Sequence, residues 1–348
     1  MSTIKATNFQ HASAAAPAIV LAADGSATAN VSSINNGPLA GFRNAIINGN
    51  FDIWQRGTSQ TAAGYGSADR WQNSRLGSTC TMSRQAFTLG QTDVPGEPTY
   101  FCRMAVTSVA DASNFSSLIQ TIEGVRTFAN QQVTVSFWAK ADASKPIAVE
   151  LLQFFGDGGA PSSFVGAIGS TKTTLTTGWQ RITVTATVPS ISGKTLGSDG
   201  RDSFRLNIFF DAGSDYNART DSLGQQSGTF DIAQVQVEPG PVATPFERRP
   251  IGTELALCQR YYFANPSGPT ALQFSGDVTA GNDYQAVAAF PTTMRIAPTV
   301  VAANVAVACF SATPGNIFSS AHGFQEQRLA TLTGRGAFIS SYTASAEL

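Results

Sequence analysis

Charged side chains are scarce in this sequence. Asp, Glu, Lys and Arg make up 13% of its 348 residues, whereas an average globular protein has about 25%. The exposed surface must therefore consist largely of Ser, Thr, Asn, Gln and Gly, or other subunits must cover much of it. The formal net charge of −1 also removes the positive surface by which proteins bind nucleic acid. Duplex DNA and anionic membranes are excluded as expected partners.

Histidine is almost missing, which excludes most catalytic arrangements. The chain has only His11 and His322, and no HExxH motif, Cys/His cluster or Ser-His-Asp triad can be assembled from them. The glycine-rich stretch 156–159 is not followed by a Lys-Ser/Thr pair or a helix start, so it does not resemble a phosphate-binding loop. We therefore expect no enzymatic activity and no cofactor.

Long apolar runs and closely spaced cysteines are missing as well. The apolar stretch 300–310 contains Asn304 and is far shorter than the roughly 20 residues that span a bilayer. Residues 1–10 contain no apolar core of a secretory signal, so we expect folding in a cytosol without membrane insertion. No CxxC pair occurs among the cysteines, which predicts buried free thiols; a Cys80–Cys102 bridge is the one disulfide worth considering. The cysteines are Cys80, Cys102, Cys258 and Cys309.

What the sequence does have is alternation of apolar and polar residues with a period of two. It occurs in residues 131–140, 146–155, 179–188 and 203–211. This period is typical of strands with one buried face, and Gly/Asp/Ser-rich turns separate the segments. No long stretch has helical periodicity. The pattern predicts an all-β protein whose main domain is a two-sheet sandwich of the jelly-roll type.

Composition divides the chain into four parts. Residues 1–40, rich in Ala, Ser, Asn and Gly, have too little apolar surface to form a core and are interpreted as an extended N-terminal attachment arm. Residues 41–249 form the predicted jelly-roll sandwich, which prolines between 239 and 250 bring to an end. Residues 250–262 are a linker with one short helix, Glu254 to Gln259, for which Thr253 is the expected N-cap. Residues 263–348 return to strand patterns and are interpreted as a smaller β domain.

An acid pair is the remaining way to obtain catalysis, because glycoside hydrolysis needs two carboxylates across a sugar. Two of the candidates, Glu150 and Asp211, fall on the polar faces of strands, where solvation explains them. The candidates are Asp52, Asp69, Glu123, Glu150, Asp211 and Asp231. We interpret them as structural rather than catalytic.

A group of aromatic residues falls on the strand faces opposite the core. Rings beside planar polar groups suit sugars, since a ring stacks on the apolar face of a pyranose while amides and guanidinium groups bond its hydroxyls. The predicted glycan contacts are Trp138, Phe154, Trp179, Arg181, Arg205, Asn207 and Phe209. The alternative is that loops or a neighbouring subunit cover this face.

Aromatic residues near the start of the sandwich are interpreted differently, as core anchors. They are Trp54, Tyr65 and Trp71. The adjacent Asp69 and Arg70 are expected to form a local salt bridge that caps this core.

Several motifs resemble a known family. Within the sandwich they are Asn44-Ala-Ile-Ile-Asn-Gly-Asn-Phe-Asp-Ile-Trp-Gln-Arg-Gly57, Ala68-Asp-Arg-Trp71, Val135-Ser-Phe-Trp-Ala-Lys140 and Asp231-Ile-Ala-Gln-Val-Gln-Val-Glu-Pro-Gly240. Together with 244–250, 254–262 and the ending 344–348, they resemble a module common in tail-fibre and other structural proteins of tailed phages and prophages. Residues 4–11, with 16–25, resemble the N-terminal arms of cyanophage virion proteins.

The resemblance implies a carbohydrate-binding-module-like jelly roll, a homotrimer and a role in contacting the host surface. Related sugar-binding jelly rolls often hold a structural calcium through an Asn-Gly-x-Phe segment and acids of the last strand. Asn48 and Asp52 match the first element, and Asp231 opens the last strand, but residues 232–235 lack the expected Asp. We therefore predict no metal, with calcium at these three residues as the alternative.

The leading hypothesis for function is a tail fibre or receptor-binding adhesin of a phage virion. Residues 1–40 would dock to other virion proteins, and the β domains would bind polysaccharide of the host surface. A capsid-attached fibre or decoration protein of the same fold is one alternative, and a glycan depolymerase or esterase is another. The protein would be assembled in the host cytoplasm and located in the virion, in the tail under the leading hypothesis and on the head under the first alternative.

Overall fold

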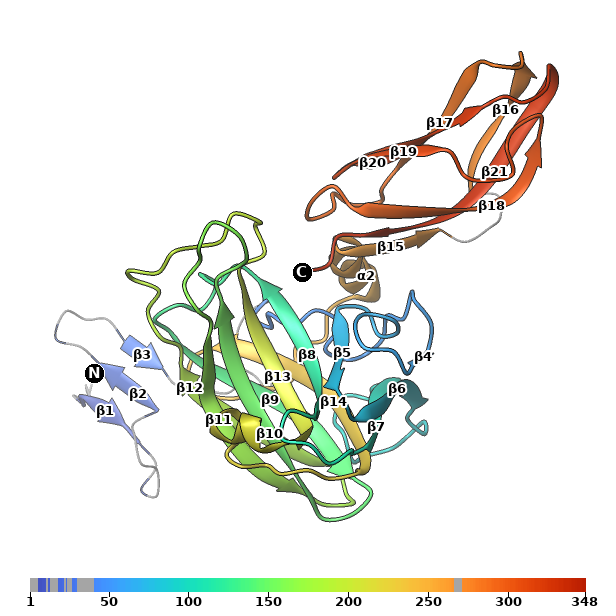
Figure 1. Cartoon of the computed structure of the whole chain (residues 1–348). Coiled ribbons are helices and arrows are strands. Elements are labelled where there is room, and N and C mark those ends of the chain that lie inside the picture. The colour runs from blue at the N-terminus through green and yellow to red at the C-terminus, as the bar shows by residue number, and fades with distance from the viewer. Residues whose placement is uncertain are drawn as a thin grey trace.

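The computed structural model describes residues 6–10, 12, 18–21, 23, 27–29, 41–265 and 271–348. The protein is all-β: a two-sheet sandwich is followed by a second, smaller pair of sheets (Figure 1). Within these described ranges, no helix has the length and apolar character needed to cross a membrane. The described part of the N-terminal segment holds three short antiparallel strands: β1 (Asn8–Phe9), β2 (Ile19–Leu21) and β3 (Ala27–Ala29). The rest of the predicted arm, including His11 and Asp24-Gly25, lies outside the described residues.

Many strands that are consecutive in the sequence belong to different sheets of the sandwich. The first sheet has the order β11-β10-β13-β8-β5, formed by Val165–Leu175, Lys145–Phe154, Ser203–Ala212, Phe115–Glu123 and Trp71–Leu76. The second has the order β12-β9-β14-β7-β6-β4, formed by Gln180–Thr187, Gln132–Ala141, Gly228–Pro239, Tyr100–Thr107, Thr79–Ala86 and Ser59–Gln60. We call them the five-stranded and the six-stranded sheet. The short helices η1 (Ser214–Tyr216) and α1 (Asn217–Thr220) follow β13.

The core lies between these sheets, as the two-residue alternation predicts. In β9, Val133, Val135 and Phe137 are at most 1% exposed, and in β13, Phe204 and Leu206 are completely buried. Their neighbours along each strand point away from the core because successive side chains of a strand point to opposite faces. Burial of this apolar area is the main stabilising contribution to the sandwich. Trp71 is also fully buried in this core, while Trp54 packs at its edge.

The Asn48-Gly-Asn-Phe-Asp52 segment is fixed by a close approach to β14. Val235 donates its N–H to the carbonyl of Gly49 (2.9 Å), at a bulge between Ala233 and Gln236. A Cβ at position 49 would lie 2.2 Å from the Val235 oxygen, so only glycine fits there. The side chain of Asn48 donates to the carbonyls of Ile53 and Asp69 and accepts from the Ile53 N–H.

The linker helix begins earlier than the sequence suggests. Helix α2 spans Ile251–Gln259, and its N-cap is Pro250, with no side-chain capping bond. The prediction that Thr253 caps a helix starting at Glu254 is wrong, because Pro250 supplies the fixed φ that pre-organises the first turn.

The C-terminal part consists of a four-stranded and a three-stranded sheet. In the first, β21 (Gly334–Ser345) pairs with β15, β16 and β18, which are Tyr262–Asn265, Leu272–Val278 and Thr299–Ala308. The second has the order β17-β20-β19, formed by Asp283–Ala289, Gly323–Leu329 and Asn316–Ser320. The core of this C-terminal part, formed by residues of both sheets, contains aromatic rings that meet edge to face. Among them are Phe310, Phe324, Phe338 and Tyr342.

The predicted Asp69–Arg70 salt bridge does not form. Asp69, completely buried, accepts hydrogen bonds from Gln55 and lies 3.8 Å from a guanidinium nitrogen of Arg56. Arg70 instead pairs with Glu347, near the end of β21. The residue therefore joins the sandwich to the C-terminal part rather than capping the core locally.

All four cysteines are free. Cys80, Cys102 and Cys258 are buried, and Cys309 is partly exposed. Cys80 pairs in register with Val106 and Cys102 with Arg84, so the two cysteines of neighbouring strands β6 and β7 do not face each other.

Candidate functional site

A cavity of about 260 Å³ opens on the outer face of the five-stranded sheet. We call it the aromatic pocket. It is lined by Ser74, Phe115, Ser117, Ile119, Leu152, Phe154, Phe164, Arg205, Asn207, Phe209, Tyr216 and Arg219. The volume lies slightly below the usual range for ligand sites, which begins at about 300 Å³, so the pocket has room for a small group only.

The register of the strands explains why these side chains meet. In β13, Asn207 pairs with Ile119 and Phe209 with Ser117, both on β8, so their outward side chains form adjacent rows. On the other side, Leu152 of β10 pairs with Arg205. The segment after β13 then turns over the sheet in η1 and α1, which brings the ring of Tyr216 to 4.9 Å from that of Phe115.

A buried carboxylate orients the polar part of the pocket. Glu150, completely buried, accepts hydrogen bonds from the Asn207 side-chain amide (2.9 Å), the Ala167 N–H (2.9 Å) and Arg219 Nε (3.0 Å). These three donors fix the position of the carboxylate, and the carboxylate in turn orients the Asn207 and Arg219 side chains. The interpretation of Glu150 as a solvated surface acid is therefore wrong, and so is that of Asp211, which is fully buried and bonded to Ser78 and Ser108.

Two buried acceptors in the wall of the pocket have no hydrogen-bond partner in the protein. The Asn207 side chain is 3% exposed, and because its amide nitrogen donates to Glu150, its Oδ1 is left unpaired. Ser117 is completely buried, and its Oγ is also unpaired. Buried polar atoms are normally satisfied, so this part of the wall is able to bond a hydroxyl group of a ligand.

Aromatic and cationic groups form the rest of the wall. The Arg205 guanidinium lies 4.1 Å from the centroid of the Phe154 ring, and burial lowers the pKa of Arg205 from its usual value. Phe164 is the most accessible ring, with 53% of its surface exposed. No Asp or Glu belongs to the described lining of this pocket, so the pair of acids needed for glycoside hydrolysis is not present in that wall.

Phe209 does not offer the open ring that the sequence predicts. It is 1% exposed and packs with Phe115, Tyr216 and Ala148 in a small core of its own. The ring therefore forms part of the structural base of the pocket. The segment 213–220, which the sequence interpretation did not place, covers it.

The other predicted contacts lie on the opposite side of the sandwich. Trp138 and Arg181 belong to β9 and β12 of the six-stranded sheet, and both line a second cavity, of about 380 Å³. Trp179 lies in an aromatic cluster with Phe87 and Phe101, with ring centroids 5.2 and 5.3 Å away. The predicted set is thus divided: Phe154, Arg205, Asn207 and Phe209 meet in the aromatic pocket, and the remaining three do not.

The residues named for calcium do not form a metal site. Asp231 pairs with Arg103 (2.7 Å) and lies 3.7 Å from Lys140, and the Asn48 side chain is fully engaged with backbone groups. The described part of the chain contains no group of three or more His, Cys, Asp or Glu that could hold a metal ion. Two of the three donors named from the sequence, Asn48 and Asp231, are therefore engaged by protein groups, while Asp52 accepts a hydrogen bond from Asn50 (2.9 Å).

Several lining residues were not identified from the sequence. Phe115 and Ile119 could have been, because they alternate with the buried Ser116 and Leu118 along β8. Phe164, Tyr216 and Arg219 lie in turns and short helices after strands, where no periodic signal exists.

Comparison with known proteins leaves the identity of the chain open. No family model matches it, and no curated protein is significantly similar to it. Among solved structures, a CBM4 domain shares 17% identity with a TM-score of 0.32, over 56% of this chain and 98% of that one. A family 11 carbohydrate-binding module of a cellulosomal cellulase from Clostridium thermocellum shares 12% identity with a TM-score of 0.31, over 52% of this chain and 95% of that one.

A phage protein is among the matches too. The enzymatically active domain of tailspike protein 4 of bacteriophage CBA120 shares 13% identity with a TM-score of 0.35, over 60% of this chain and 24% of that one. The chain thus spans about a quarter of that tailspike structure. At such identities and TM-scores, none of these matches assigns a ligand or an activity to this chain.

Proposed function

We propose that this chain is a glycan-binding structural protein of a tailed-phage virion, and that the aromatic pocket receives a sugar unit of the host surface. The observation that supports glycan binding is the pair of buried, unpartnered acceptors, Asn207 Oδ1 and Ser117 Oγ, in an aromatic wall. A sugar fits both features, because its hydroxyls donate hydrogen bonds and its ring presents C–H groups to aromatic faces. The virion role is supported by the motifs described above and by the low charge, since subunit interfaces deplete charged residues.

The proposal includes binding without hydrolysis. An acyl- or glycosyl-transfer site needs a nucleophile or an acid pair with access to the ligand. In the described lining of the aromatic pocket, the ionisable groups are Arg205, Arg219 and Tyr216. The carboxylate of Glu150 behind them is already bonded to Arg219, Asn207 and a backbone N–H.

Binding is tested with purified protein on an array of bacterial surface polysaccharides, followed by calorimetry on any ligand found. Phe164→Ala should weaken binding about tenfold, which corresponds to about 1.4 kcal/mol, and should leave the melting temperature unchanged. Phe318→Ala is a matched control, because Phe318 is also 53% exposed but lies on β19 of the C-terminal part. Equal binding by both variants, or release of reducing sugar by the wild type, would contradict the proposal.

The virion role needs a separate test. Immunogold labelling of intact particles should place the protein at the tail, whereas labelling of the head would favour the capsid-attached alternative. A chain lacking residues 1–40 should remain folded but fail to enter particles. Light scattering should give about three times the chain mass of 36.5 kDa for a trimer.

A further inference from the structure

A second cleft lies on the other side of the sandwich, over the six-stranded sheet and beside the start of α2. It consists of a cavity of about 600 Å³ and another of about 380 Å³, and the side chain of Arg248 lines both. We call it the arginine cleft. Its lining includes Asn50, Asp52, Tyr100, Trp138, Arg181 and Arg248.

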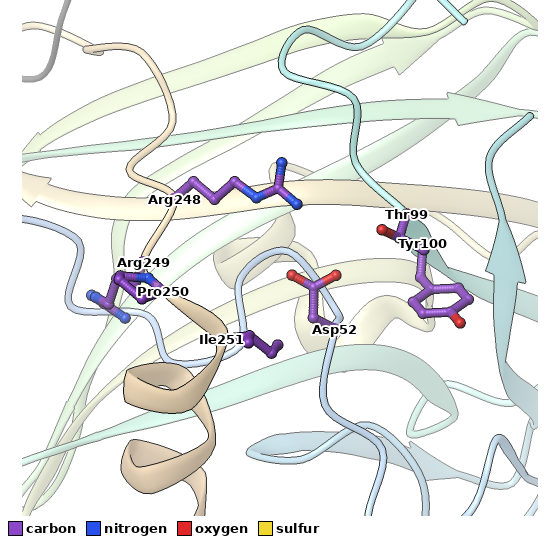
Figure 2. A pocket seen from close by; sticks show the side chains of 7 residues that line it. All are labelled: Asp52, Thr99, Tyr100, Arg248, Arg249, Pro250 and Ile251. Carbon is purple, nitrogen blue, oxygen red and sulfur yellow. The ribbon is translucent and has the colours of Figure 1, made fainter. Parts of the chain in front are cut away.

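Figure 2 shows how the charged groups are arranged in the larger cavity. The guanidinium of Arg248 and the carboxylate of Asp52 approach the same space from different loops, with Tyr100 beside them, while Arg249 points away. Arg249 is engaged elsewhere, with Glu254 and the carbonyl of Ile46. Among the ion pairs of the described residues, none within 4.0 Å joins Arg248 to Asp52.

Among the described residues, no carboxylate lies within ion-pair distance of Arg248 or Arg181, the two arginines that line the cleft. On the same face, Arg43 pairs with Glu238 (2.6 Å) and Arg103 with Asp231 (2.7 Å). In the part of the chain that the structure describes, Arg248 donates to the carbonyl of Gly96 (3.2 Å), and Arg181 donates to Ser136 and to the carbonyl of Thr244. Burial lowers the pKa of Arg181 from its usual value, and the carboxylate of Glu238, which pairs with Arg43, offsets only part of this effect.

A buried acceptor in the same cleft independently indicates a ligand. Asn50 is 7% exposed, its amide nitrogen donates to Asp52 (2.9 Å), and its Oδ1 has no partner in the protein although the side chain lines the cavity. Burial also raises the pKa of Asp52, while the hydrogen bond from Asn50 and the charge of Arg248 act in the opposite direction. The acceptors Asn50 Oδ1 and Asp52 match a ligand with hydroxyl groups, and the two guanidinium groups match an anionic group.

We propose that the arginine cleft binds an acidic saccharide, one whose sugar units carry a carboxylate or sulfate group. Arg248 and Arg181 bind the anionic group, since a guanidinium matches two oxygens at once. Asn50 Oδ1 and Asp52 accept hydrogen bonds from hydroxyls, and Trp138 provides a ring on which a pyranose face can stack. The site is separate from the aromatic pocket and does not depend on the function proposed for it.

The test uses the full-length protein with three probes: polygalacturonate, dextran sulfate and neutral dextran. We expect affinity for at least one of the acidic polymers, none for dextran, and a loss of affinity as salt is added. Preference for polygalacturonate would identify a carboxylate ligand, and preference for dextran sulfate a sulfate ligand. Lack of binding to both acidic probes would contradict the proposal.

Variants separate a defined site from general charge attraction. Arg248→Gln should reduce affinity for the acidic probe at least tenfold, whereas Arg126→Gln should leave it unchanged. Arg126 is a suitable control because it is also exposed and lies outside the cleft, in the turn after β8. Equal losses in both variants would overturn the proposal. Phe164→Ala should not change this affinity, so the two sites can fail independently.

Discussion

The guanidinium of Arg70 lies 3.5 Å from the centroid of the Tyr261 ring. Arg70 immediately precedes β5 of the sandwich and is 1% exposed, while Tyr261 follows α2 and is 3% exposed. Beside them, Arg56 lies 3.6 Å from the ring of Tyr262. Both arginines bind the carboxylate of Glu347, so cation–π and ionic contacts together fix the C-terminal part against the sandwich.

Replacing Glu347 tests this junction. Glu347→Gln leaves the buried guanidinium of Arg70 without its carboxylate, and we expect a loss of about 3 kcal/mol in the free energy of unfolding, since a buried charge loses its partner. Chemical denaturation followed by tryptophan fluorescence measures it. Glu123→Gln is the control, because the Glu123–Arg260 pair is 41% and 37% exposed and should contribute less than about 1 kcal/mol. Equal losses in the two variants would contradict the structural role of Glu347.

Phe209 and Phe164 should respond oppositely to truncation, although both line the aromatic pocket. Phe209→Ala removes a ring that is 1% exposed and should cost about 3–5 kcal/mol in stability through the cavity left behind. Phe164→Ala should change stability by less than about 0.5 kcal/mol and affect only ligand binding. Thermal unfolding of both variants decides the matter. A stable Phe209→Ala protein would restore the prediction of an open ring at that position.

The alternation of residues predicts which side of each strand faces the core, and the buried faces of β9 and β13 agree with it. It does not predict which sheet a strand joins, because that depends on pairing between distant segments. Strands β9 and β10 are consecutive but belong to different sheets. The outward residues Trp138 and Phe154 therefore lie on opposite sides of the sandwich, and the residues expected on a single face line two separate cavities.

Contacts across long sequence separations escaped prediction for the same reason. Arg70 was expected to pair with its neighbour Asp69, but its partner Glu347 is 277 residues away. Alternation places the acids Glu150 and Asp211 on a solvated face. It cannot show that η1, α1 and other segments cover that face, and this is why the expectation fails. The Asn48-Gly-Asn-Phe motif, which the resemblance connects with calcium, has a different role in the structure, because it places Gly49 directly against the Val235 carbonyl.

Gly49 provides a test of that approach. Gly49→Ala places a Cβ 2.2 Å from the Val235 oxygen, which forces the loop away from the β14 bulge and should cost about 1–3 kcal/mol in stability. Gly252→Ala is the matched control, because a Cβ there meets nothing within 4 Å and alanine favours the helix α2. Equilibrium unfolding in urea should show destabilisation of the first variant and none of the second. Because Asn50 and Asp52 follow Gly49, the first variant should also lose affinity for acidic saccharide.

The buried thiols predict how stability changes at alkaline pH. Burial raises the pKa of Cys80 from 9.0 to about 11 and that of Cys102 in the same direction. At a pH between these two pKa values of Cys80, the thiol keeps its proton in the folded chain but has lost it in the unfolded chain. The free energy of unfolding should therefore fall as the pH rises from about 9 towards 11. Cys80→Ala removes one such group and should reduce this slope, as denaturation at several pH values can measure. An unchanged slope would mean that Cys80 is accessible to water.

The same shift predicts thiol reactivity, because the thiolate is the reactive form. At mildly alkaline pH, a thiol reagent should modify Cys309, which is partly exposed, and leave the buried Cys80, Cys102 and Cys258 protected until the chain unfolds. Cys309→Ser should abolish the rapid reaction of the folded protein. Rapid modification of Cys80 or Cys102 would show that the sandwich core opens readily, which its continuous apolar packing argues against.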